Sequence, residues 1–304
     1  MKLYRQIKSQ IAQELSFLLA CPAIIWQVFF LFLPLTILLL HSVIEFSPVT
    51  NSYTFTLKYY SLLLNTTYFK ILINSIIIAT STTLICFLIA YPLAYYLALK
   101  VQKRFRPFLL FSLILPSWTS LIIQVYAWFF LLEKNGIITQ FFKYIGLLSE
   151  SAHLLNNYFA VLIGMVCVYL PFMTLPLYTV LEKVDPTVLE ASADLGASRL
   201  ETFKRVIFPL SLPGVYVGFL LVFLPALGEF AIPALLGGNK MAFWGTVIVN
   251  KLLVSREWAS GAAFATLGVL FTCLLIASIH IISKIITFIK KRPQEVPRKQ
   301  HDIW

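Results

Sequence analysis

Charged side chains are scarce in this chain. Of its 304 residues only 12% are Asp, Glu, Lys or Arg, against about 25% in ordinary soluble domains. Hydrophobic residues make up 59% and the mean hydropathy is +0.85, a composition that would leave a water-soluble fold with far too much exposed apolar surface. Intrinsic disorder is excluded as well, because it requires low hydrophobicity and a high density of charge. The composition therefore predicts a polytopic membrane protein of the all-α class.

Groups that carry catalysis or bind metals are also few. The sequence has no Gly-x-x-x-x-Gly-Lys-Ser/Thr phosphate loop, and Gly237-Gly238-Asn239-Lys240 does not have its spacing. None of the spacings of metal sites occurs among the histidines and cysteines, which are His41, His153, His280, His301, Cys21, Cys86, Cys167 and Cys273. We therefore expect a chain that is not an enzyme and binds no metal or cofactor of its own. ATP and Mg²⁺, if they drive its work, would be bound by a separate ATPase.

Six apolar stretches are long enough to cross a bilayer, which takes about 17–25 residues of helix. These stretches are Leu18–Leu40, Ile71–Ala98, Phe108–Leu132, Tyr158–Leu181, Pro213–Leu236 and Ala259–Ser283. Before the first, apolar residues recur every four positions within residues 1–17, which predicts a short amphipathic helix lying on the membrane surface. After the last, residues 284–304 form a basic tail.

Basic residues divide unevenly between the two sets of gaps that separate these spans. Seventeen lie in the set that includes both termini, and seven lie in the other set. Because cytoplasmic loops carry the excess of Lys and Arg, both termini are predicted to be cytoplasmic. A reporter after Lys103 or at Lys299 is expected inside, and one near Asn51 or Asn239 outside. Nucleic acid is not an expected partner, because the basic residues occupy short gaps and not a soluble face with stacking aromatics.

The fourth gap, between the fourth and fifth spans, has the most informative local pattern. Asp185-Pro186 predicts a helix start, with Asp as the cap and Pro at the first helical position. Gly196 predicts the end of that helix. Ser198-Arg199-Leu200-Glu201 is a capping box that predicts a second helix, which we expect to end near Pro209. An amphipathic connector without further role is one interpretation of this pair of helices. The other is a docking surface, because small residues on the first helix would let another protein approach its backbone.

The same gap resembles the EAA loop of binding-protein-dependent ABC importer permeases. The family pattern is Glu-Ala-Ala, three residues, Gly, nine residues and Ile-x-Leu-Pro; this chain has Glu190-Ala191-Ser192, Gly196 and Val206-Ile207-Phe208-Pro209 at that spacing. Its departures are Ser192, Val206 and Phe208. In that family the loop docks into a groove on the cytoplasmic ATPase. The resemblance thus implies coupling roles for Glu190, Ala191, Ser192, Asp194, Gly196 and Pro209. It also implies the ABC transporter type I permease fold over about residues 70–281.

A closer resemblance is to spermidine/putrescine permeases, a polyamine-transporting branch of that family. Residues 116–128, with Asn135-Gly136 after them, are similar to the third span of those permeases, and residues 227–238 to the fifth. Asp194-Leu195-Gly196-Ala197-Ser198 also suits that branch. Gln124 stands where the family often carries Arg. Permeases for sulfate, molybdate, phosphate or iron share the EAA loop, so these solutes remain alternatives to a polyamine.

The resemblance also implies a set of partners and a location. It implies a second homologous permease subunit, a cytoplasmic ATPase dimer that hydrolyses the ATP, and an extracytoplasmic polyamine-binding protein. The chain itself would lie in the lipid bilayer of a bacterial inner membrane as a multi-pass protein and would work by alternating access. An ion-gradient secondary transporter is the alternative mechanism. Such proteins usually show internal repeats, and none stands out in this sequence.

Glu229 is the only acidic residue well inside a predicted span. A charge there costs at least about 2.5–3.5 kcal/mol on insertion scales, so such residues usually face a cavity or a partner. Nearby prolines predict a kinked or broken helix around it. We expect Glu229 to face a pathway for a cation, with Gln124 and cation–π contacts from Trp118, Tyr126 and Trp128. The alternatives are a structural carboxylate for Glu229 and an aromatic belt at the membrane interface for the rings.

Overall fold

The computed structural model describes residues 20–47, 52–61, 65–149, 154–238 and 241–290. The predicted amphipathic segment 1–17, the end of the basic tail from residue 291, and the reporter positions Asn51, Asn239 and Lys299 lie outside these ranges. Most of the described chain is helical, as the composition predicted.

Helices of very different length alternate along the chain, with one short pair of strands near its start. In chain order the elements are η1 (Val28–Phe32), α2 (Leu33–Val43), β1 (Ile44–Ser47), β2 (Ser52–Phe55), α3 (Lys58–Ser61), α4 (Thr66–Leu99), α5 (Arg106–Ile114), η3 (Leu115–Trp118), α6 (Leu121–Leu132), α7 (Ile137–Tyr144), α8 (Tyr158–Leu181), α9 (Pro186–Asp194), α10 (Arg199–Thr202), η4 (Phe203–Ile207), α11 (Phe208–Gly228), α12 (Ala231–Leu236), α13 (Trp244–Val249), η5 (Asn250–Val254) and α14 (Trp258–Lys290).

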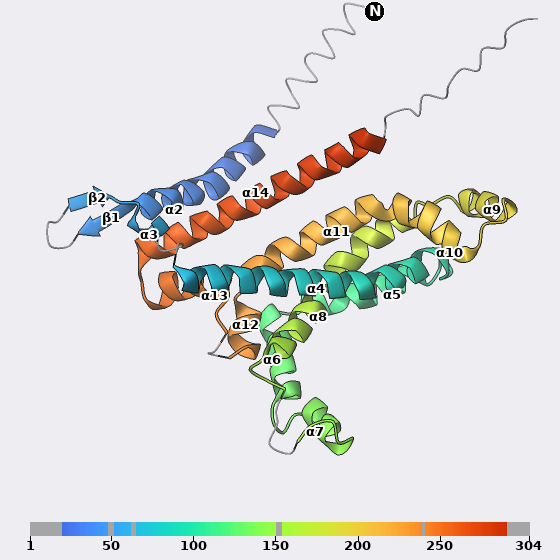
Figure 1. Ribbon diagram of the computed structural model, residues 1–304, viewed down its shortest axis with the longest axis horizontal. Coiled ribbons are helices and arrows are strands. Elements are labelled where there is room, and N and C mark those ends of the chain that lie inside the picture. Colours follow the sequence, from blue (N-terminus) through green and yellow to red (C-terminus); the bar gives the residue numbers. More distant parts are fainter. Residues whose placement is uncertain (1–19, 48–51, 62–64, 150–153, 239–240, 291–304) are drawn as a thin grey trace, which may run out of the picture.

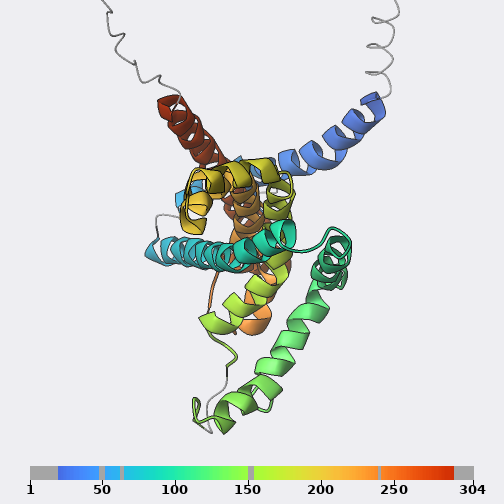
Figure 2. The same ribbon diagram turned by 90° about the vertical axis from the view of Figure 1, so that its right-hand side faces the viewer.

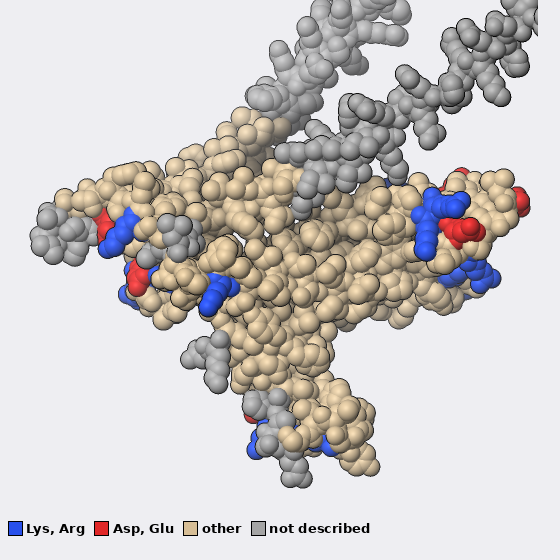
Figure 3. All heavy atoms as spheres, in the orientation of Figure 1, with Lys and Arg blue, Asp and Glu red and all other residues tan. Residues whose placement is uncertain are grey.

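Six helical stretches in the described chain are long and apolar enough to cross a membrane. They are Ala20–Val43, Thr66–Leu99, Leu121–Tyr144, Tyr158–Leu181, Arg199–Gly228 and Trp258–Ser278. Charged side chains gather at the two ends of the molecule and at the tip of α7, with an uncharged band between (Figure 3). Six spans and an all-α membrane fold are thereby confirmed.

The centre of the fold is a bundle of α4, α8 and α11 (Figure 1). Helix α11 approaches α8 closely at two glycines one helical turn apart, because neither glycine has a side chain to keep the helices apart. A Cβ atom at Gly214 would lie 2.8 Å from the carbonyl oxygen of Pro176, and one at Gly218 would lie 2.7 Å from the sulfur of Met173. Helices in a membrane associate through such small residues, because lipid provides little hydrophobic drive between them.

These contacts predict opposite effects of alanine at two glycines of α11. Gly214→Ala places a methyl group against backbone and should destabilise the chain by about 1–3 kcal/mol. Gly228→Ala meets open space, with no atom within 4 Å, and should be neutral or slightly stabilising because alanine favours helix. Thermal unfolding of the two purified variants in one detergent measures the difference; equal midpoints would contradict the close approach.

The first span packs on the last one. A short hairpin of two strands lies between the first and second spans. Helices α2 and α14 lie against each other, crossing as they run (Figures 1 and 2). Strands β1 and β2 pair antiparallel, with Ile44 opposite Phe55 and Glu45 opposite Thr54. This hairpin was not predicted from the sequence.

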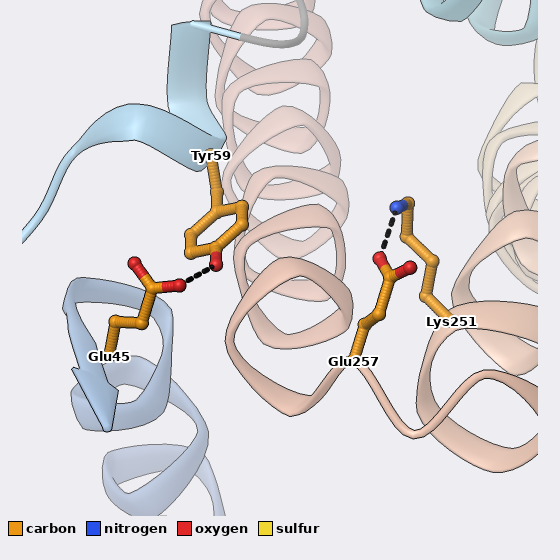
Figure 4. Close-up of polar contacts among 4 residues, drawn as sticks. All are labelled: Glu45, Tyr59, Lys251 and Glu257. Atoms are coloured by element: carbon orange, nitrogen blue, oxygen red, sulfur yellow. Dashed lines mark hydrogen bonds and ion pairs between the residues drawn. The ribbon is translucent and has the colours of Figure 1, made fainter. Parts of the chain in front are cut away.

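Polar contacts fasten the hairpin end of the molecule (Figure 4). The Tyr59 hydroxyl donates to Glu45 Oε1 over 2.6 Å, and Lys251 Nζ lies 3.0 Å from Glu257 Oε2. Burial, then the hydrogen bond and negative charge of Glu45 and the charge of Glu257, raise the pKa of Tyr59 to about 12. The phenol therefore keeps its proton at physiological pH and acts as the donor.

The third predicted span is not one helix. The apolar run predicted a continuous helix over Phe108–Leu132, whereas the structure divides that stretch into α5, the 3₁₀ turn η3 and α6. Pro116 lies in the turn, and the Gln124 side-chain amide donates to its carbonyl oxygen and, over 2.9 Å, to Thr119 Oγ1. Helix α6 then forms an arm that ends in α7, away from the central bundle (Figure 2).

Candidate functional site

The EAA-like loop (residues 182–212) begins with α9, which forms as its sequence predicts. The Asp185 carboxylate accepts a hydrogen bond of 2.9 Å from the Thr187 N–H, and Pro186 is the first helical residue. Gly196 ends the turn with φ at +78°. Its N–H donates to the Ala193 carbonyl and the Ala197 N–H to the Ser192 carbonyl, the Schellman arrangement that favours glycine.

The second helix of the loop is tied to the first. Ser198 and Glu201 form the predicted capping box. In addition, the hydroxyl oxygens of Ser192 and Thr202 lie 2.9 Å apart and link α9 to α10. Ser192, where the family pattern has alanine, thus fixes the angle between the two helices.

Pro209 does not end a helix, contrary to the sequence-based expectation. Helix α10 continues through the π-helical turn η4 into α11, giving one helical stretch from Arg199 to Gly228. In the wider turn the Phe208 N–H reaches back to the Phe203 carbonyl. Pro209 follows as an early residue of α11, where a proline disturbs the hydrogen-bond ladder least.

The EAA-like loop presents an exposed surface at one end of the molecule (Figure 1). Glu190, Ala191 and Asp194 of α9 are exposed. Leu195 and Leu200 expose 88% and 61% of their surface. Large apolar side chains that are this exposed, at an end of the molecule outside the uncharged band, are typical of a docking surface.

An ion pair at the end of α8 also connects the loop to the start of α5. Arg106, the first residue of α5, lies 3.5 Å from Glu182 Oε1, and its Nε donates to the Val101 carbonyl over 3.0 Å. The pair joins the end of α8 to the start of α5.

The loop caps have a defined pH dependence. Hydrogen bonds from Thr187 lower the pKa of Asp185, and those from Ser198 lower the pKa of Glu201. A carboxylate with a lowered pKa stabilises the fold above its ordinary pKa and loses that effect as the pH falls through its lowered value. The loop should therefore keep both caps at neutral pH and lose them only in acid.

Glu229 lies in a break between α11 and α12. Its Oε1 accepts hydrogen bonds from the N–H groups of Phe230 and Ala231, over 3.0 and 2.9 Å. Its Oε2 accepts one from the Tyr169 hydroxyl of α8, over 2.7 Å. The break predicted for this helix is confirmed, and the half-buried carboxylate links the start of α12 to α8.

The backbone around the break is closely packed. A Cβ atom at Gly245 of α13 would overlap the Gly228 carbonyl oxygen, so only glycine fits there. The Trp244 N–H donates to Ser75 Oγ of α4 over 2.7 Å. Helix α13 thus packs against the break, and a hydrogen bond from α13 to α4 holds α13 in place.

The other predicted pathway residues share the η3–α6 segment, and no described contact joins them to Glu229. Trp118 is 73% exposed, with its ring edge-on to Phe111. Tyr126 is exposed and its ring stacks on Phe130, whereas Trp128 is half-buried against the core. Gln124 braces the η3–α6 turn through its bonds to Pro116 and Thr119.

Tyr169, whose side chain bonds to the Glu229 carboxylate, was not among the residues predicted from the sequence. A tyrosine in an apolar span gives no signal of its own, and 60 positions separate the pair. Within the described part of the chain, no group of three or more His, Cys, Asp or Glu side chains is placed to hold a metal ion.

Comparison with known proteins agrees with this architecture. Residues 87–292 match the family described as binding-protein-dependent transport system inner membrane component. The chain is 41% identical over 240 residues to the spermidine/putrescine transport system permease protein PotB of Haemophilus influenzae, which covers 78% of this chain and 83% of that protein. It is 41% identical over 239 residues to PotB of Escherichia coli, covering 78% and 86%.

A solved structure shows the same fold. The crystal structure of a bacterial ABC transporter involved in the import of the acidic polysaccharide alginate matches with a TM-score of 0.72 and 17% sequence identity. The match covers 94% of this chain and 100% of that one. Members of the matching family are transport components and not enzymes. This chain belongs to the family of binding-protein-dependent transport system inner membrane components.

Proposed function

We propose that this chain is the membrane-spanning permease subunit of an ATP-driven importer for polyamines such as spermidine and putrescine. The observation that carries the substrate is the 41% identity to spermidine/putrescine permeases over more than three quarters of the chain. The physical support is Glu229, a carboxylate directly after the end of the fifth span at Gly228, whose hydrogen-bond donors among the described residues are all neutral.

The proposed complex contains a second similar permease, two ATPase subunits and an extracytoplasmic polyamine-binding protein. ATP and Mg²⁺ would be bound by the ATPase subunits. The exposed face of α9, with Glu190, Ala191 and Asp194, would dock on the ATPase together with Gly196 in the turn that follows. Closure of the ATPase dimer would then push α9. Through the ion pair of Glu182 and Arg106, it would also move the start of α5.

The substrate pathway is proposed to pass the α11–α12 break. A polyamine that has lost part of its hydration there is attracted to the Glu229 carboxylate more strongly than in bulk water. The C-terminal end of α11 adds the negative end of its helix dipole. Trp118, Tyr126 and Trp128 on the arm would supply ring faces worth about 0.5–2 kcal/mol each to an ammonium group.

Uptake by the reconstituted complex tests this function. The chain is expressed with the proposed sister permease, ATPase and binding protein, and the complex is placed in vesicles containing ATP. We expect labelled spermidine or putrescine to accumulate only with ATP and the binding protein, and unlabelled polyamine to compete. Competition by sulfate, molybdate or iron instead would reject the polyamine assignment.

The orientation is a further prediction, because the basic residues place both termini in the cytoplasm. The connection between α4 and α5, which contains Lys103, lies at the same end of the molecule as α9, and the β1–β2 hairpin lies at the opposite end (Figure 1). Reporters after Lys103 and at Lys299 should report cytoplasm, and reporters near Asn51 and Asn239 the outside. An external signal at Lys299 would contradict the predicted orientation.

A further inference from the structure

We propose that Tyr169 is a positioning residue for polyamine passage, because its hydroxyl holds the Glu229 carboxylate in the orientation that meets the substrate. The inference rests on the proposed function and deepens it. It adds a residue of α8 to the substrate site proposed at the α11–α12 break.

The geometry leaves the carboxylate one orientation. The terminal torsion of a glutamate side chain is broad and has no strongly preferred value, so hydrogen bonds decide it. The two N–H groups of Phe230 and Ala231 hold Oε1, and the Tyr169 hydroxyl holds Oε2. Without the Tyr169 hydroxyl, hydrogen bonds would hold only Oε1, and the carboxylate could rotate about its Cγ–Cδ bond.

Tyr169 is itself held firmly. Only 7% of its surface is exposed, and its ring lies beside Phe172 of the same helix, with the centroids 6.4 Å apart. A buried hydroxyl requires a partner, and the described contact of this one is Glu229. Among the described residues, the Glu229 carboxylate is thus the partner that satisfies this buried hydroxyl.

The carboxylate retains capacity for a cation. Two oxygens offer about four lone-pair sites, and three are occupied by the bonds from Phe230, Ala231 and Tyr169. The ion pairs of the described residues are Arg106–Glu182 and Lys251–Glu257, so no described basic side chain neutralises Glu229. A charge held by neutral donors, with an unused acceptor site, suits transient contact with an ammonium group.

The test uses the whole complex in vesicles, with loaded binding protein at saturation, and measures ATP hydrolysed for each polyamine imported. A residue that only supports the fold lowers uptake and hydrolysis together, whereas a residue that guides substrate raises this ratio. We expect Tyr169→Phe to raise the ratio about tenfold, the effect of one hydrogen bond to a charged group. Glu229→Gln should raise it at least as much.

A double variant shows whether Tyr169 acts through Glu229. In the Glu229→Gln background, Tyr169→Phe should change the ratio no further, because the charge that the hydroxyl orients is gone. Tyr216→Phe on α11 is the matched control: its hydroxyl has no hydrogen-bond partner among the described residues, and the ratio should stay at the wild-type value.

Several results would overturn the inference. They are an unchanged ratio in Tyr169→Phe or in Glu229→Gln, effects that multiply in the double variant, and a parallel loss of uptake and hydrolysis. Failure of the proposed function is recognised separately, because it appears in the wild-type complex as import of neither polyamine. That result would overturn the substrate and this inference together.

Discussion

Replacing Gly196 with Asp is expected to abolish substrate uptake while leaving the chain inserted in the membrane. Gly196 has φ at +78°, and a Cβ atom there would meet no other atom of the chain within 4 Å. The substitution therefore strains the backbone only locally, by about 1–2 kcal/mol. The new carboxylate, however, would stand on the surface proposed to dock on the ATPase.

We expect the new negative charge, and not the backbone strain, to cause most of the loss of uptake. An unpaired charge enclosed in an interface weakens binding by about 2–5 kcal/mol, which is roughly 30-fold or more in affinity. Glu190 and Asp194 already make the exposed face of α9 acidic, so a third carboxylate adds repulsion between like charges. Recovery of the ATPase with the tagged permease, and uptake by the same cells, measure the effect.

Gly196→Asn is the matched control for that experiment. Asn and Asp adopt positive φ about equally well, and they differ here in charge alone. We expect the Asn variant to keep most of its ATPase and its uptake. If the Asp variant transports like the wild type, α9 is not the docking element; if Asn fails as badly as Asp, the defect is in the turn and not in the charge.

Glu229→Gln is expected to reduce polyamine uptake by about 10- to 100-fold, the loss of one charge-assisted contact. The amide can preserve the local structure. Its oxygen can accept from Phe230 and Ala231, while its NH₂ group donates to the Tyr169 hydroxyl with the roles reversed. The substitution therefore removes the charge and little else.

Glu229→Asp provides the complementary variant. It keeps the charge on a side chain shorter by one methylene, which cannot reach both Tyr169 and the start of α12. We expect a milder defect than with Gln. Uptake and assembly of the complex are measured side by side. Wild-type uptake with Gln would identify Glu229 as a structural link between α8 and the start of α12, with no role for its charge.

Local chemistry determined much of this protein from the sequence alone. Membrane insertion depends on the summed transfer free energy of about 20 consecutive residues, so five spans needed only the apolar runs. Helix caps are equally local: the bonds of Asp185, Ser198 and Gly196 join residues no more than five positions apart. The EAA-like spacing was also readable from the sequence, because it lies within one continuous segment from Glu190 to Pro209.

The tertiary structure decided where helices break and which polar groups meet. Pro209 lies inside a helix because a π-helical turn absorbs it, whereas the stretch Phe108–Leu132 divides at Pro116, where Gln124 supports the turn. Neither outcome follows from the presence of proline alone. In a bilayer the apolar faces of helices are nearly equivalent to lipid, so close approach and paired polar groups select the partners. The contact between Tyr169 and Glu229, and that between Ser75 and Trp244, join residues 60 and 169 positions apart; only the packing of α4, α8, α11 and α13 brings them together.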